Sequence, residues 1–300
     1  MAAVEWAVDK VEPRLKQFGN YPDGYLKPVA HAIEYAHALA AKVPGPISVT
    51  RDSYAADPLV HALFHLPEDL QSAFDASRAM DEFQRRNPSV TEVYGLVCMR
   101  RNIKKMFGME MRGDILRRDV DQEAVYFTDF TLAEPGLTEA ESRQRIAEGF
   151  FKSLVGHVAN RISALKTERA RDEIERDEWL SRMRGAKLEA HAEAQAGLEA
   201  VLRRLTESVH DLELGRYHHH FEAVLLNPEK FLYLEQTEMN LDSMGIVRKP
   251  NAAGSDEIEF CDLIGRDRRR WTVALLYCNH VKPRSSISDK LANAQRWLGF

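Results

Sequence analysis

Three consecutive histidines, His218–His220, stand close in the chain to His210 and Glu222, and these residue types are common ligands of metal ions. Adjacent residues of a helix point about 100° apart, so the three imidazoles cannot all reach one ion. In a strand, His218 and His220 could bind an ion together. We interpret the run as solvent-facing or capping histidines near a helix end, with metal binding as the alternative.

A second pair, His61 and His65, has the i, i+4 spacing with which one helix face supplies two zinc ligands. No acidic general base lies between them, and Pro67 ends the helix directly afterwards. We expect no metal site at this pair.

Acidic residues gather between positions 119 and 129. Carboxylates that converge in a cleft can bind Mg²⁺ or transfer protons. Most of these acids lie in or beside an expected turn, next to Arg117 and Arg118, so ion pairs on the surface explain them. We therefore expect no catalytic residue among Asp119, Asp121, Glu123 and Asp129.

Two groups of basic residues are candidates for anion binding, because guanidinium groups hold pairs of phosphate or carboxylate oxygens. The first group crowds an expected turn between strands and consists of Arg266, Arg268, Arg269 and Arg270. The second group is Arg100, Arg101, Lys104 and Lys105. A phosphate, a nucleotide, an acidic partner or the acidic face of another copy would fit such a group. The alternative for the first group is a solvated hairpin tip.

The stretch from Thr138 to Leu214 contains no proline and favours helix throughout. Apolar residues in each half recur at steps of three and four, which is the spacing of a coiled-coil seam. The residues expected to form a seam for self-association or for a partner are Phe151, Leu154, Val158, Leu165, Leu198, Leu202, Leu205, Val209 and Leu212.

This helical tract either folds back on itself or pairs as one long helix with a second copy. A reversal at Gly185 would set Leu165 opposite Leu205 and Val158 opposite Leu212, which favours an antiparallel hairpin. The charged residues around the reversal predict that its far part projects into solvent. A single helix that dimerises in parallel is the alternative.

Shorter patterns predict the remaining elements. Helices are expected at 25–42, 57–64, 67–87 and 89–107, the last beginning at a capping box, and a final one at 285–300. Two strands between 109 and 130 should form a hairpin with its turn at 117–121, and four more are expected at 231–234, 245–247, 258–263 and 271–278. The last of these is apolar almost throughout, which is typical of a central strand.

The predicted fold class is α+β and predominantly α, with a helical N-terminal layer, a small, mostly antiparallel sheet and a long, coiled-coil-like antiparallel hairpin inserted between the strand segments. Its regions are a helical part at 1–107, a β-hairpin at 108–137 that joins the C-terminal sheet, the helical hairpin at 138–215, and a β-rich part with a closing helix at 216–300. Two isolated strands are only marginally stable, which is why the hairpin at 108–137 should share the later sheet.

Composition excludes several classes of protein. The 300 residues carry 41 basic and 46 acidic side chains, a net charge of −5 that argues against a dedicated nucleic-acid binder. No apolar run reaches the roughly 18 residues of a transmembrane helix. An acid at Glu5 departs from a secretory signal, so we expect a cytoplasmic protein without membrane insertion. Three cysteines, Cys98, Cys261 and Cys278, do not suggest a disulfide framework.

These observations favour a non-enzymatic cytoplasmic scaffold or interaction protein. Its projecting hairpin would mediate self-association or bind a protein partner, and no cofactor is expected. The alternative is a regulatory protein that binds a small anion or a nucleotide through the arginine-rich turn at 266–270.

Overall fold

The computed structural model describes residues 1–48, 53, 56–64, 77–112, 115–185, 188–211, 213–265 and 269–279. The chain divides into two compact units, Met1–Ala36 with Phe150–Phe231 and His37–Gly149 with Leu232–Phe300. The α-helices are α1 (Ala2–Val11), α2 (Asp23–Ala41), α4 (Pro58–Leu63), α6 (Arg78–Arg86), α7 (Glu139–Gly185), α8 (Leu188–Asp211) and α9 (Leu214–Leu225). The short 3₁₀ helices are η1 (Pro13–Gln17) and η2 (Pro228–Lys230).

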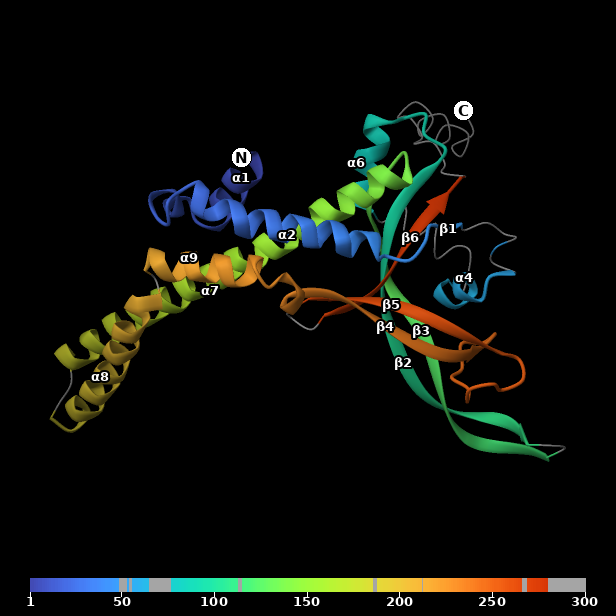
Figure 1. Ribbon diagram of the computed structural model, residues 1–300. Helices are drawn as coiled ribbons and strands as arrows, with labels where there is room; N and C mark the ends of the chain where they lie inside the picture. The colour runs from blue at the N-terminus through green and yellow to red at the C-terminus, as the bar shows by residue number, and fades with distance from the viewer. Residues whose placement is uncertain are drawn as a thin grey trace, which may run out of the picture. The chain divides into compact units, whose positions relative to one another are not determined.

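The strands are β1 (Ile47–Ser48), β2 (Val93–Arg112), β3 (Ile115–Gly136), β4 (Leu232–Asp242), β5 (Ser255–Gly265) and β6 (Arg270–Cys278). Helices predominate, and α7 and α8 lie in the chain between β3 and β4. The predicted fold class is therefore confirmed (Figure 1).

The first unit packs α1, η1, α9 and parts of α2 and α7 around aromatic side chains. Tyr25 is fully buried, and its hydroxyl donates hydrogen bonds to the carbonyl oxygens of Leu15 and Phe18 at 3.1 Å. Its ring lies 5.3 Å from that of Phe221 on α9. Burial raises the pKa of Tyr25 to about 12, so this hydroxyl stays a donor at neutral pH.

Helices α7 and α8 form an antiparallel hairpin within one chain, which rules out a single continuous helix. Nε of Arg204 donates to Oδ1 of Asp172 at 2.9 Å, and Gly197 lies directly against Trp179. Residues at equal distance from position 188 therefore lie at the same level of the two helices. The prediction that Leu205 faces Leu165 is wrong, because it took Gly185 as the centre of the reversal.

The second unit is built on one sheet with the strand order β3-β2-β6-β5-β4, in which these neighbours are all antiparallel. The short β1 also pairs with β6, in parallel. The central place of β6 is confirmed, as is the sharing of one sheet by β2, β3 and the later strands.

Short helices cover one face of this sheet. Asp57 caps α4 by accepting from the backbone amides of Leu59 and Val60, as Pro58 at the first helical position favours. Ser77 caps α6 and donates to the carbonyl oxygen of Leu132 on β3. The core under these helices includes Val60, Leu63, Phe64, Met80, Phe83, Val97, Met99, Phe127, Phe260, Ala274 and Leu276.

The predicted helix at 89–107 is wrong, because β2 begins at Val93. The capping-box pattern is a local signal, whereas residues 93–99 are paired with β3 on one side and with β6 on the other. Such long-range pairing overrides a local helix signal. The helical N-terminal region therefore ends before Val93.

The predicted turn at 117–121 is also wrong, because these residues belong to β3 and the chain reverses between Arg112 and Ile115. Strand β3 instead contains three bulges. At each bulge β3 has one residue more than the segment of β2 opposite it. Each coincides with a residue of positive φ: Asp119 at 59°, Asp129 at 56° and Glu134 at 51°. Aspartate enters this left-handed conformation more readily than most residues.

Other predicted elements are only partly described. Residues 245–247 make isolated bridges to Ala124 and Leu241 rather than a regular strand. The helix predicted at 67–87 is represented by α6, since 65–76 lie outside the described residues, as does the closing helix at 285–300.

Candidate functional site

The base of the hairpin is held to the first unit by charge and by aromatic contacts. Lys166 of α7 forms an ion pair with Glu12, which follows α1, and its ammonium lies 5.7 Å from the ring of Tyr217. Glu12 also accepts a hydrogen bond from Nε of Arg14 at 2.8 Å. The bond from Arg14, reinforced by Lys166, lowers the pKa of Glu12 to about 2, although burial opposes this.

Beyond Lys166, the polar and aromatic contacts between α7 and other described elements are with α8. Arg204 bridges Asp172 and Glu175, and the hydrogen bond to Asp172 raises the pKa of this guanidinium. Trp179 covers Gly197. The hairpin thus closes its own seam with ion pairs and one large aromatic side chain.

The predicted seam residues do not share one surface. Phe151, Leu154, Val158, Leu165 and Leu205 are buried, Leu198 is half-buried and Leu202 is exposed. The backbone of Val209 belongs to α8, and Leu212 lies outside the described residues.

Among the side chains of α8 that the structure describes, the buried ones that the prediction missed are Ala194 and Val201. With Leu198 and Leu205 they form a second heptad series. This series is harder to recognise in the sequence than the predicted one, because two of its positions are an alanine and a valine.

The described arginines of the turn at 266–270 have partners. Arg270 donates to Glu235 at 2.9 Å and to Asp262 at 3.4 Å, and Arg269 also has an interaction. Arg266 and Arg268 lie outside the described residues. Anion binding by this turn stays a prediction.

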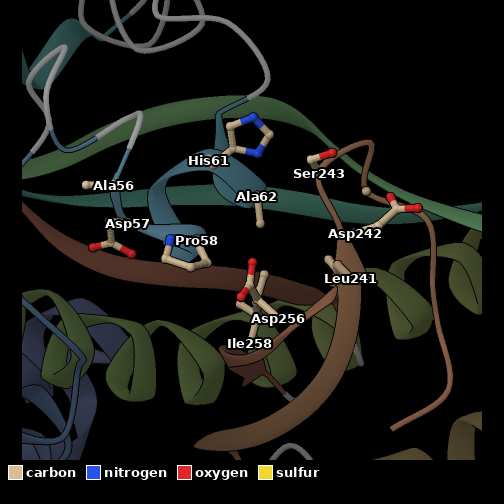
Figure 2. Close-up of a pocket in the computed structure, with 11 residues that line it drawn as sticks. Ala56, Asp57, Pro58, His61, Ala62, Leu241, Asp242, Ser243, Asp256 and Ile258 are labelled. Atoms are coloured by element: carbon tan, nitrogen blue, oxygen red, sulfur yellow. The ribbon is translucent and has the colours of Figure 1, made fainter. Parts of the chain in front are cut away.

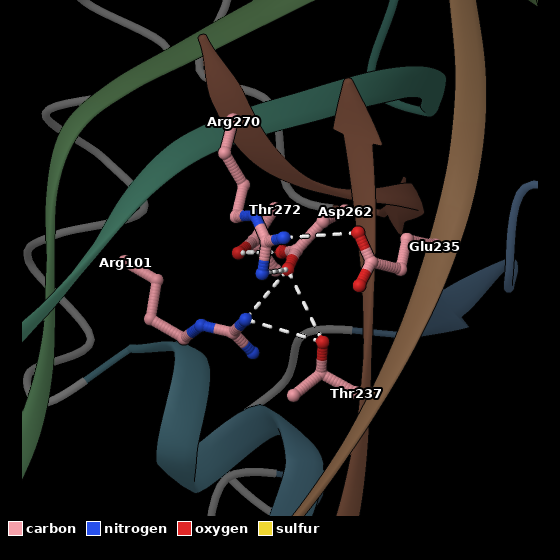
Figure 3. Close-up of polar contacts among 6 residues, drawn as sticks. All are labelled: Arg101, Glu235, Thr237, Asp262, Arg270 and Thr272. Carbon is pink, nitrogen blue, oxygen red and sulfur yellow. Dashed lines mark hydrogen bonds and ion pairs between the residues drawn. The ribbon is translucent and has the colours of Figure 1, made fainter. Parts of the chain in front are cut away.

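A buried polar network joins the sheet at Asp262 on β5 (Figure 3). Nη2 of Arg101 donates to Asp262 at 2.6 Å and to Thr237 at 3.3 Å, while the hydroxyl of Thr272 donates to Asp262 at 2.7 Å. Burial lowers the pKa of Arg101 against the attraction of Asp262. Arg101, predicted as part of a basic group, thus serves the interior of the sheet, where its Nη1 is buried without a partner in the described structure.

The other members of the second basic group are on the surface. Arg100 pairs with Asp129 at 3.4 Å and lies 5.6 Å from the ring of Trp271. Lys104 is exposed, and Lys105 is 3.9 Å from Glu123 across the strand pair. Asp129 and Glu123 thus have surface ion-pair partners, but these partners are on β2 and are not Arg117 and Arg118.

The acidic group is spread along β3 and does not form one site. Asp119 and Asp129 are bulge residues, while Asp121 and Glu123 occupy regular pairs opposite Phe107 and Lys105. Within the described residues, no cluster of three or more His, Cys, Asp or Glu side chains could hold a metal ion.

The histidine run lies on α9 and has divergent environments. His218 packs against the rings of Tyr25 at 4.9 Å and Phe18 at 5.6 Å, and its Nε2 is 3.6 Å from Glu222. The interpretation of a solvent-facing run is wrong for His218, which is mostly buried, and correct for the exposed His219.

A pocket of about 340 Å³ opens beside α4, lined by Asp57, His61, Asp242, Ser243 and Asp256 among others (Figure 2). Asp57 is occupied as a helix cap. Burial opposes ionisation of Asp242, but hydrogen bonds from Ile246, Met244 and Arg248 outweigh it and lower the pKa. These two carboxylates thus stabilise local turns. His65 lies outside the described residues.

The distal part of the β2–β3 ribbon exposes large apolar side chains. Phe107 is 72% exposed, Met109 61%, Ile103 52% and Met106 40%. Contiguous exposed apolar side chains often mark interaction surfaces. The sequence prediction missed this surface, because it assigned residues up to 107 to a helix.

None of the three cysteines forms a disulfide bond. Burial raises the pKa of Cys98 to about 12 and that of Cys261 to about 11, so neither is a reactive thiolate at neutral pH.

Among the described helices, none combines the length and apolarity that a membrane span requires. Comparisons of the chain with protein-family models, with curated proteins and with solved structures gave no significant match.

Proposed function

We propose that the chain is a non-enzymatic cytoplasmic interaction protein that self-associates through the α7–α8 hairpin. The observation that carries this proposal is a pair of exposed apolar side chains on an otherwise charged hairpin. Ile174 on α7 is 62% exposed and Leu202 on α8 is 44% exposed. Both are at equal distance from position 188, which sets them at the same level of the two helices.

The internal contacts of the hairpin support this role. Asp172, Glu175 and Arg204 hold the two helices together without help from another part of the described chain. Ile174 and Leu202 are therefore not needed to close the hairpin. In an isolated copy their apolar side chains stay in contact with water, which is unfavourable. A second hairpin that covers them would remove apolar surface from water in both copies.

The test replaces both side chains by lysine, in the variant Ile174→Lys with Leu202→Lys. The matched control is Ala170→Lys with Ala200→Lys, which adds the same charge at exposed positions of the same helices. Light scattering after gel filtration should show that the first variant loses at least half of the mass of the wild-type assembly, while the control keeps it. Circular dichroism checks that both remain helical. Equal masses for the wild type and the first variant would contradict the proposal.

A further inference from the structure

The outer edge of β2 is unpaired along the distal ribbon. Pairing of β2 with β6 ends at Met99 opposite Thr272, whereas pairing with β3 continues to Arg112 opposite Ile115 (Figure 1). Among the described residues, no strand or bridge pairs with the outer edge of β2 from Arg100 onward.

The ladder determines which residues direct their backbone groups out of this edge. On the far side of β3, the amide of Val125 donates to Gly245 and the carbonyl of Glu123 accepts from Val247. Val125 and Glu123 thus point these groups away from β2. In an antiparallel pair the residues opposite them do the same, so Ile103 and Lys105 direct N–H and C=O outward from β2.

The same alternation extends along β2, because the bulge near this point adds its extra residue to β3 and leaves β2 regular. Phe107 therefore also presents outward backbone groups, whereas the carbonyl of Met109 accepts a hydrogen bond from the Gln122 side chain of β3 at 3.2 Å. The side chains of Phe107 and Met109 are the two most exposed apolar side chains among the described residues of the ribbon. A long exposed edge with large apolar residues is a surface that native proteins cover or block.

We propose that this edge pairs with the same edge of a second copy, β2 against β2 in antiparallel orientation, with the two-fold axis at Phe107. Outward-facing residues must oppose one another in such a ladder. An axis at Lys105 would bring two lysines together, whereas an axis at Phe107 pairs the two phenyl rings. It also sets Lys104 opposite position 110 of the other copy, which is a glutamate.

This register explains why the occupant is a second copy. The arrangement is isologous, because each copy supplies the same edge. A dimer therefore pairs both edges and leaves none for a third copy. Residue types of opposite charge are set opposite one another twice by symmetry, at Lys104 of each copy and at position 110 of the other. The inference uses no residue of the helical hairpin and stands independently of the proposed function.

The first test separates the two interfaces by using the hairpin variant Ile174→Lys with Leu202→Lys as its background. In that background we expect a dimer by sedimentation velocity, and Phe107→Lys should reduce its mass by half because two lysines would meet at the axis. Met244→Lys, at a similarly exposed apolar residue in the turn after β4, should leave the dimer intact. A background that is already monomeric, or a dimer that survives Phe107→Lys, would overturn the proposal. A hairpin variant with the wild-type mass would instead contradict the proposed function.

The second test examines the register. Lys104→Glu and Glu110→Lys should each weaken the dimer, and the double variant should restore the wild-type mass. Lys104 faces Ala124 within its own ribbon, so Lys104→Glu disturbs no cross-strand charge pair inside one copy. Glu110→Lys sets a lysine opposite Arg117 of β3, so circular dichroism must show that this variant stays folded. Hydrogen exchange at the amides of Ile103, Lys105 and Phe107 should be slow in the dimer and fast in Phe107→Lys. Unprotected amides in the dimer, or a double variant that stays monomeric, would refute pairing at this edge in this register.

Discussion

The helical hairpin and the β-ribbon are both made of two antiparallel segments, but they differ in what they leave unsatisfied. Helices α7 and α8 bond their backbone groups internally, so only side chains such as Ile174 and Leu202 remain to contact a partner. The β2–β3 ribbon satisfies one edge of each strand and leaves β2 with outward N–H and C=O groups. Association through the hairpin thus depends on side-chain identity, whereas association through the ribbon also depends on the backbone.

The two regions also differ in how deeply the ion pairs at their bases are buried. The hairpin is tied to its unit by the ion pair of Lys166 with Glu12, in which the lysine is half-exposed. The ribbon is tied to the sheet by the pair of Arg101 and Asp262, of which the carboxylate is fully buried. A buried charge is far more costly to leave without its partner than a charge near water.

The largest expected effect follows from breaking the base of the ribbon. Asp262→Asn leaves the buried guanidinium of Arg101 without its counter-charge and should lower the free energy of unfolding by about 3 to 5 kcal/mol. Guanidinium chloride titration measures it. The double variant Arg101→Met with Asp262→Leu should recover most of the loss, since no unpaired charge stays inside. A double variant as unstable as Asp262→Asn would show that the cost is in the packing and not in the charge.

A smaller, pH-dependent effect is expected at the base of the hairpin. The pKa of Glu12 is about 2 in the folded protein against an ordinary value of 4.5, so its stabilisation is complete above pH 4.5 and is lost as the pH falls toward 2. Glu12→Gln should cost about 2 to 3 kcal/mol at pH 7. The difference in unfolding free energy between wild type and variant should shrink as the pH is lowered. A difference that is constant between pH 7 and pH 3 would refute the assigned cause.

The smallest effects test the packing of the hairpin with two glycines of helical conformation. A Cβ at Gly197 would lie 2.5 Å from Cε2 of Trp179, whereas one at Gly156 would meet nothing within 4 Å. Gly197→Ala should therefore destabilise the protein by about 1 to 2 kcal/mol. Gly156→Ala should stabilise it by about 0.5 to 1 kcal/mol through helix propensity. Thermal unfolding compares the two, and a gain at Gly197 would disprove the tight contact with Trp179.

Periodic patterns were sufficient to predict the fold class, the helical hairpin and three of the four later strands, those in β4, β5 and β6. They were insufficient for β2, where the local signal of Ser89–Glu92 favoured a helix and the strand depends on partners far away in the chain. They also missed the bulges, because Asp119 and Asp129 are as typical of a turn as of a bulge.

The candidate surfaces were predictable to different extents. The reversal of the hairpin follows from its apolar stripes, but two heptad series fit α8. The contacts of Arg204 with Asp172 and of Gly197 with Trp179 distinguish them. The pair of Arg101 and Asp262 joins residues 161 positions apart, which no spacing rule connects. The apolar surface at Phe107 depends on the strand assignment and was lost with it.

The three bulges of β3 have a consequence for how two copies can exchange partners. Strand β3 has its extra residues at Asp119, Asp129 and Glu134. A shift of β2 along β3 would therefore place each bulge opposite residues that are now regularly paired. The incoming β2 of another molecule has no such extra residues and cannot replace β3. An incoming β2 should therefore add at the free edge without displacing β3, and dissociation on dilution should need no unfolding of either copy.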